Sequence, residues 1–175
     1  MKFFLISTIA LMSLLPAAHV DLYVLTGQSN SLGTTAGGEA DVSPGVDPAD
    51  AQVKFFWSNR ATSSVVIGDS GGGFSTLQSQ QGGYYSGSTT HWGPEVGFAR
   101  SLYRAGVRNF GIIKASRGGG GNSYWLKDGS DDHMYDHIVA TVQAAAANLT
   151  SQGHTFTIKG FLYLQGESDS AAEAS

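Results

Sequence analysis

The sequence contains no cysteine among its 175 residues. Disulfide bonds and thiolate metal ligands are therefore excluded as sources of stability or chemistry. Charged residues are also scarce, at 14% of the chain, and no run of lysine or arginine occurs. With a net charge of −4 and no basic cluster, the chain is not expected to bind nucleic acid. What the sequence has in abundance is glycine, with 24 residues, which indicates long loops.

The first residues have the pattern of an export signal. Lys2 provides a positive start, residues 3–15 form an apolar stretch, and Ala18 offers a small-residue cleavage point. A single membrane anchor is the alternative, but this stretch is shorter than the ~20 residues that span a bilayer. We therefore predict a cleaved signal peptide at 1–18, with no stable membrane insertion afterwards. Because the chain lacks cysteine, the domain at 19–175 is expected to be periplasmic or secreted from a bacterium.

Short apolar runs alternate with helical patterns along the rest of the chain. Buried strands are expected at residues 21–26 and 109–114, and a third strand is expected at 157–165. Two helices are expected between them, from Gly93-Pro94-Glu95 to Gly106 and from Asp136 to Leu149, the second with Ile138, Val142, Ala145 and Leu149 on one face. This alternation predicts a parallel sheet with helices on its faces.

Two further segments fit this pattern less well. Residues 52–57 and 64–67 are weaker strand candidates, and we interpret them as a peripheral hairpin. Residues 68–91 are rich in glycine and serine, and we expect them to form a long surface loop. Loops of this length in a compact domain usually serve a function.

Polar segments follow each of the three main strands. They read GQSN after the first strand, ASRGGGG after the second and QGESD after the third. Ligands of parallel sheets bind beyond the carboxyl ends of the strands, so these segments are expected to converge on one edge. The sequence therefore places a candidate site there.

Ser29 is a candidate nucleophile in the first of these segments. A serine on a turn between strand and helix projects from the sheet edge, where free backbone N–H groups can receive an oxyanion. The alternative is that Ser29 and Asn30 merely cap a helix. The segment differs from the G-x-S-x-G elbow, because Ser31 takes the place of the second glycine.

The other two segments could supply donors and an acid. Backbone N–H groups of the glycine run from Gly118 to Gly121 could approach a substrate, and Gln165 could donate a side-chain N–H. A flexible loop and a loop-pinning hydrogen bond are the respective alternatives. Glu167 and Asp169 could orient a histidine, although Asp169 or Ser170 could equally begin a helix.

Four blocks together resemble the sialate O-acetylesterase-like branch of the SGNH hydrolases, which includes the acetylxylan esterases of carbohydrate esterase family 6. They are GQSN, WGPEVGFARSL, GIIKASRGGG and GFLYLQGESD, and the resemblance covers residues 21–169. It implies a three-layer α/β/α flavodoxin-like fold with a parallel sheet. It also implies a serine esterase that removes acetyl groups from carbohydrates such as acetylated xylan or O-acetylated sialic acid, with no metal or other cofactor.

The resemblance also assigns roles to particular residues. Ser29 matches the nucleophile, and Glu167 matches an acidic residue of the catalytic block. The oxyanion-hole positions match the backbone of Ser29, the glycine at Gly118 or Gly119, and the side chain of Gln165. Aromatic residues that could stack on sugar rings are Trp92, Trp125, Tyr84, Tyr85 and Tyr124, several of which could equally be packing residues.

The family's histidine base, in a late Asp-x-x-His block, has no counterpart here. None of the five histidines has aspartate three residues earlier. His133 and His137 stand four apart, but Met134 replaces the glutamate of H-E-x-x-H, so a zinc site is not expected. We therefore expect a domain that is incomplete at its C-terminus, with the histidine beyond Ser175, and a fragment with little activity and an open, aggregation-prone sheet edge.

Two rival functions remain open at this point. A non-catalytic carbohydrate-binding or surface module could use the same fold, since a fold does not determine function. A peptidase or lipase with the same serine chemistry would differ only in its substrate-binding loops. No feature of the sequence specifies an oligomeric state.

Overall fold

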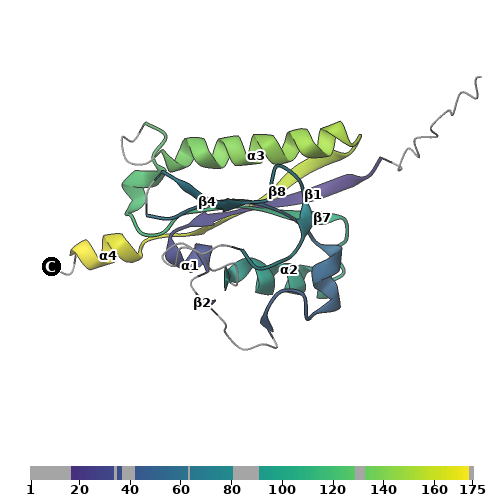
Figure 1. The fold of residues 1–175 in the computed structure, drawn as a ribbon, viewed down its shortest axis with the longest axis horizontal. Helices are drawn as coiled ribbons and strands as arrows, with labels where there is room; N and C mark the ends of the chain where they lie inside the picture. Colours follow the sequence, from purple (N-terminus) through teal and green to yellow (C-terminus); the bar gives the residue numbers. More distant parts are fainter. Residues whose placement is uncertain are drawn as a thin grey trace, which may run out of the picture.

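The computed structural model describes residues 17–33, 35–36, 42–62, 64–80, 91–128 and 133–173. The predicted signal peptide, apart from Ala17 and Ala18, lies outside these residues, as do Tyr84 and Tyr85. The described chain forms a sheet between helices, with α3 (Met134–Ser151) on one face and α1 (Ser29–Leu32) and α2 (Pro94–Arg104) on the other (Figure 1). This arrangement confirms the predicted α/β class.

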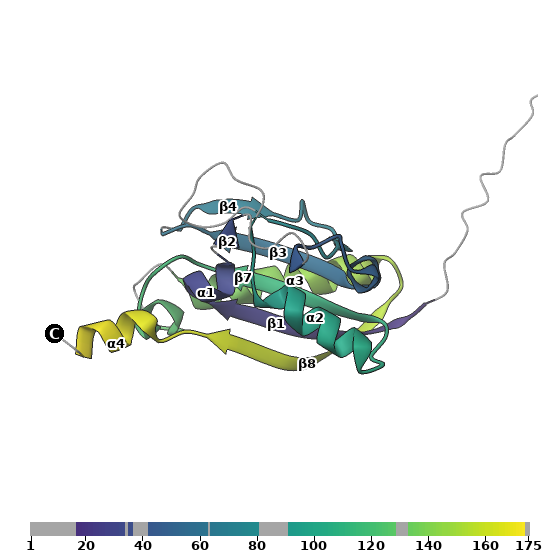
Figure 2. The ribbon, with the colours of Figure 1, turned by 90° about the horizontal axis from the view of Figure 1, so that it is seen from below.

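The main sheet has the strand order β4-β3-β7-β1-β8, in which β4 is Val66–Asp69, and β5 (Ser75–Thr76) is paired to β3. The four strands β3 (Lys54–Arg60), β7 (Phe110–Ser116), β1 (His19–Gly27) and β8 (Thr155–Leu164) are mutually parallel. Figure 2 shows them side by side, with β8 along one border. A two-stranded ribbon of β2 (Thr35–Ala36) and β6 (His91–Trp92) lies apart from this sheet.

Apolar residues cover both faces of the central strands because helices pack on both sides. Every residue of β7 is buried, as expected for an internal parallel strand. One core cluster, beneath α2, includes Leu25, Phe55 and Ile112, and the other, beneath α3, includes Leu22 and Ile113.

The hairpin prediction was wrong about position. Residues 54–60 and Val66–Asp69 do form the antiparallel pair β3 and β4. However, β3 also pairs in parallel with β7, so it is an internal strand of the main sheet. The segment 68–80 is also less of a surface loop than expected, because Leu77 and Gln80 are each only 2% exposed.

The helix predicted from Asp136 to Leu149 is α3, and its buried face differs from the predicted face by part of a turn. Ala145 and Leu149 are buried as expected, but Ile138 and Val142 are only partly buried. Met134, His137 and Thr141 complete the buried face instead. None of the helices in the described part of the chain is long and apolar enough to cross a membrane.

The last strand, β8, borders the sheet among the described strands and leaves large apolar side chains exposed. Ile158, Phe161 and Tyr163 are 49%, 59% and 44% exposed. These side chains form an apolar stripe on a strand that pairs only with β1 among the described residues, and the predicted tendency to aggregate would act at this edge.

Candidate active site

The registers of three parallel strands end together at one border of the sheet. Gly27 of β1 pairs with Ser116 of β7 on one side and with Leu164 of β8 on the other. The three polar segments therefore begin at the same level, as predicted. Helices α1 and α4 (Glu167–Glu173) lie at this end of the sheet (Figure 1).

A tight turn at Gly27 carries the chain from β1 into α1. Gly27 has a φ of 138°, and a Cβ atom built there would stand 1.9 Å from the carbonyl oxygen of Leu164. The next residue, Gln28, donates its backbone N–H to that same oxygen at 3.0 Å. Glycine is therefore required where β1 and β8 come closest, and the turn places Ser29 directly beyond the sheet.

Ser29 is the first residue of α1 and is partly exposed. The helix cap is Gln28, which makes no side-chain cap bond, so the capping alternative for Ser29 and Asn30 is wrong. No hydrogen bond joins the Ser29 hydroxyl to another described residue. Its backbone N–H is likewise without an acceptor in the described part of the chain, as is usual in a first helical turn.

The glycine loop, residues Gly118 to Gly121, follows β7 and lies beside this turn. The backbone N–H of Arg117 donates to the carbonyl of Gly27 at 3.1 Å, which joins the loop to the end of β1. The N–H of Gly118 is already donated to the carbonyl of Ala61 at 2.8 Å. Gly119, with a φ of 67°, has no acceptor for its N–H among the described residues. Of the two glycine candidates, only Gly119 therefore has a donor to offer.

Gln165 follows β8 and reaches the same loop from the other side. Its side-chain N–H donates to the carbonyl of Gly120 at 2.8 Å. The loop-pinning alternative is therefore realised in this structure. The amide nitrogen carries two hydrogens, so the second remains for an oxyanion.

The two acids of the third segment have different neighbours. Glu167 begins α4 and accepts a hydrogen bond from the side chain of Asn30, one residue beyond Ser29. The carboxylate of Asp169 accepts the backbone N–H of Asn122, with its oxygens at 3.1 and 3.0 Å. Since α4 starts at Glu167, a helix start at Asp169 or Ser170 was wrong. Asp169 instead joins α4 to the start of the short 3₁₀ helix Asn122–Trp125.

A buried ion pair, which was not predicted from the sequence, contacts the last residue of α1. Lys114 of β7 donates to Glu95 of α2 and to the carbonyl of Leu32, both at 2.8 Å, and both side chains are fully buried. Burial lowers the pKa of Lys114, and the adjacent Glu95 carboxylate opposes that shift. Since Leu32 ends α1, this pair fixes the helix that carries Ser29. The sequence signal was a lysine inside an otherwise apolar strand.

Buried hydrogen bonds extend this support to β3. The hydroxyl of Ser31 donates to the Gln28 carbonyl at 2.7 Å and is hydrogen-bonded to the Ser116 hydroxyl at 2.9 Å. The side chain of Gln80 donates to Glu95 at 2.8 Å and accepts from Asn59 at 3.2 Å. A satisfied polar network of this kind holds its members in one arrangement.

Of the three sugar-contact candidates that the structure describes, two are buried. Trp92 lies in the core beneath α2 and is 9% exposed, so its position fits packing rather than sugar stacking. Trp125 is equally buried and donates to the Thr26 hydroxyl at 3.3 Å. Tyr124 is partly exposed, with the Arg117 guanidinium 4.3 Å from its ring centre. The ring of Tyr163 packs edge-on against the ring of Trp125. Tyr163 was not among the aromatic candidates predicted from the sequence.

No hydrogen bond among the described residues joins a histidine to Ser29. His19 and His154 lie at the opposite end of the sheet, next to Thr155 and Ala18. His133 is exposed, whereas His137 is buried, so they do not share a face. The described residues contain no group of three or more potential metal ligands.

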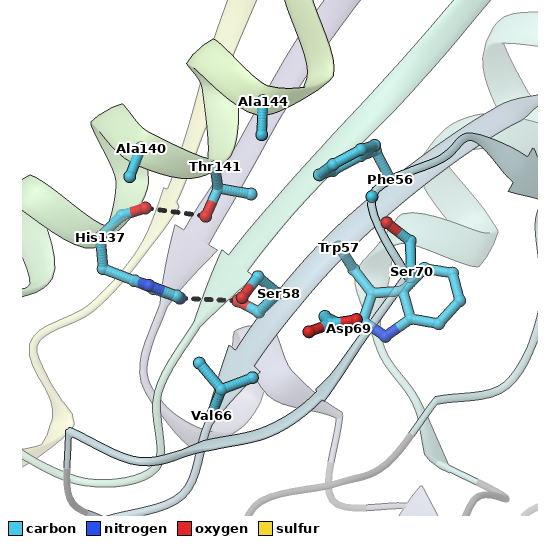
Figure 3. A pocket seen from close by; sticks show the side chains of 11 residues that line it. Phe56, Trp57, Ser58, Val66, Asp69, Ser70, His137, Ala140, Thr141 and Ala144 are labelled. Atoms are coloured by element: carbon cyan, nitrogen blue, oxygen red, sulfur yellow. Dashed lines mark hydrogen bonds between the residues drawn. The ribbon is translucent and has the colours of Figure 1, made fainter. Parts of the chain in front are cut away.

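A separate cavity lies between α3 and the β3–β4 pair, with a volume of about 270 Å³ (Figure 3). Phe56, Val66 and Ala144 supply apolar walls. His137 also lines it, and its ring nitrogen Nε2 is 2.8 Å from the carbonyl oxygen of Ser58. Burial lowers the pKa of His137. The cavity is distinct from the site at the strand ends.

The fold and this site define a parallel α/β protein with a serine, a glycine loop and an amide gathered at the carboxyl edge of its sheet. Residues 19–175 match the family described as carbohydrate esterase, sialic acid-specific acetylesterase. The chain belongs to this family. The match confirms the resemblance drawn from the four sequence blocks. A comparison with curated proteins found no match.

Solved structures share the fold at low sequence identity. A protein from Arabidopsis thaliana is similar over 88% of this chain, with 19% identity and a TM-score of 0.52. A carbohydrate acetylesterase from Xanthomonas citri is similar over 85% of this chain, with 17% identity and a TM-score of 0.50. The chain spans 59% and 32% of the lengths of these two structures.

Proposed function

We propose that this chain carries the nucleophile and the oxyanion-binding groups of a serine esterase that removes O-acetyl groups from carbohydrates. The observation that carries this proposal is the common register of β1, β7 and β8, which gathers Ser29, the glycine loop and Gln165 at one border. Family membership supports an acetyl ester of a carbohydrate as the substrate.

In the proposed reaction, the Ser29 hydroxyl attacks the acetyl carbonyl carbon while a histidine takes its proton. The N–H groups of Ser29 and Gly119 and the side chain of Gln165 receive the oxyanion of the tetrahedral intermediate. Collapse releases the sugar alcohol, which takes the proton from the histidine, and leaves acetyl-Ser29. Water, deprotonated by the same histidine, then releases acetate and restores Ser29.

The histidine is the missing part of this scheme. Since no described histidine is hydrogen-bonded to Ser29, we propose that an Asp-x-x-His segment encoded beyond Ser175 supplies the base. Glu167 is hydrogen-bonded to the side chain of Asn30, the residue after Ser29. In this scheme Glu167 would lie near the proposed histidine. Triad residues act as a unit, so the 175-residue chain alone should turn over slowly.

The lack of a hydrogen bond between Ser29 and any described histidine also favours one alternative. Without a base elsewhere, the strand-end site would be a carbohydrate-binding module that holds acetylated sugar without cleaving it. The two functions differ in whether acetate and the deacetylated carbohydrate are formed.

Acetate release from acetylated xylan and from O-acetylated sialic acid distinguishes them. We expect the product of the complete gene to release acetate from at least one of the two, and Ser29→Ala to abolish the release. Binding of either substrate without any release would support the non-catalytic module. Release that is unaffected by Ser29→Ala would overturn the proposed nucleophile.

A further inference from the structure

The side chain of Arg117 lies beneath the glycine loop and is only 4% exposed. Its Nη1 donates to the carbonyl oxygens of Gly118 at 2.7 Å and Gly119 at 2.9 Å. Its Nη2 donates to the carbonyl of Thr62 at 2.7 Å, which anchors the guanidinium to the chain just after β3. One rigid cation therefore holds two consecutive peptide groups of the loop.

These bonds determine where the loop's N–H groups point. In a planar trans peptide the C=O and the N–H face opposite ways. With the carbonyls of Gly118 and Gly119 turned toward Arg117, the N–H groups of Gly119 and Gly120 are turned away from it. No described residue accepts a hydrogen bond from either N–H. Successive N–H groups on one side of a loop form a concavity that binds anions.

The glycines make this arrangement possible. Gly119 and Gly120 have φ values of 67° and 89°, in the region that L side chains rarely adopt. A Cβ atom at Gly120 would stand 2.9 Å from the Arg117 guanidinium and from the Tyr124 ring. The loop is thus fitted closely around the cation.

We propose that Arg117 is a positioning residue for the proposed esterase, one that turns the Gly119 and Gly120 N–H groups toward the oxyanion of the acetyl group. This inference rests on the proposed function. A guanidinium bonded to a carbonyl also polarises that peptide, which strengthens its N–H as a donor. Gln165, which holds the carbonyl of Gly120 at 2.8 Å, completes the orientation from the β8 side.

Arg117→Lys and Arg117→Gln test this role in the complete gene product. Lysine keeps the charge but cannot span the two carbonyls and Thr62 as a fork does, and glutamine loses the charge as well. We expect kcat for an aryl acetate to fall about 10- to 100-fold in the lysine variant and further in the glutamine variant. KM should stay within about twofold, because the oxyanion exists only after attack.

Arg108 offers a matched control. It too lies over a tyrosine, 3.9 Å from the centre of the Tyr103 ring, and donates to the carbonyls of Tyr103 and Val107, but it is exposed and belongs to the segment after α2. Arg108→Lys and Arg108→Gln should leave kcat and KM unchanged. A crystal structure of Arg117→Lys should show the Gly118–Gly119 peptide rotated.

Each outcome decides between explanations. Unchanged kcat in both Arg117 variants, or a rise confined to KM, would overturn the positioning role. Failure of both variants to fold would assign Arg117 to stability instead. A wild-type protein with no Ser29-dependent turnover would overturn the esterase proposal together with this one, whereas a loss seen only at Arg117 and not at Arg108 supports it.

Discussion

The side-chain amide of Gln165 donates to the carbonyl oxygen of Gly120 at 2.8 Å, which joins the end of β8 to the glycine loop after β7. We predict that Gln165→Ala lowers kcat for an aryl acetate by about 100-fold, since it removes both this tie and a side-chain donor. Gln165→Glu should lose as much, because a carboxylate cannot donate to Gly120. Steady-state kinetics of the two variants would refute these roles if either kept the wild-type kcat.

Two serines separated by one residue should respond in opposite ways to truncation. Ser29→Ala removes a hydroxyl that no described residue binds, so the free energy of unfolding should change by less than about 0.5 kcal/mol while turnover is lost. Ser31→Ala breaks buried bonds to Gln28 and Ser116, and should cost about 1–2 kcal/mol with most turnover kept. Urea unfolding and esterase assays of both variants check this contrast. The reverse pattern would place the nucleophile at Ser31.

Gly27 should tolerate no side chain. A Cβ atom there would overlap the Leu164 carbonyl at 1.9 Å and hold alanine at a φ of 138°, so Gly27→Ala should destabilise by more than about 2 kcal/mol. Gly97 in α2, which has open space around its added Cβ, is the control. Gly97→Ala should stabilise by up to about 1 kcal/mol, because alanine favours helices. Thermal melts of the two variants measure the difference, and equal melting temperatures would contradict the turn described here.

The buried imidazole of His137 should make stability depend on pH. Burial lowers its pKa from the usual 6.5, so the unfolded chain takes up a proton at a higher pH than the folded protein does. The free energy of unfolding should therefore decrease as pH falls below 6.5, with a slope approaching about 1.4 kcal/mol per pH unit for this one proton. His137→Gln should reduce that slope relative to the wild-type protein. Urea titrations at several pH values test this, and identical slopes in the variant and the wild type would contradict it.

Strands could be predicted where a single segment of the sequence carries the signal, and strand pairing between distant segments could not. Strands β1 and β7 were predicted because buried parallel strands are written as continuous apolar runs. Strand β8 also has an apolar run, although none of its residues is buried. Strand β3 was misplaced because its local antiparallel pairing with β4 is typical of a separate hairpin, whereas its parallel pairing with β7, as in Phe55 with Ile112, has no local signal in the sequence.

The candidate site could also be predicted only in part. The polar ends of the strands could be predicted from topology, since parallel strands share a carboxyl edge. The Lys114–Glu95 pair and the Arg117 contacts could not, because burial and hydrogen-bond partners arise only when distant segments pack. The occupied N–H of Gly118, which leaves Gly119 as the donor, is likewise a product of packing against Ala61.

The most direct measurement is the mapping of a covalent adduct after reaction of the complete gene product with an aryl organophosphate. Peptide mass spectrometry should find one phosphoryl group, on Ser29. It should be absent from Ser29→Ala, and acetate release should fall in proportion to labelling. An adduct on a different residue, accompanied by loss of turnover, would contradict the account, as would full acetate release from Ser29→Ala.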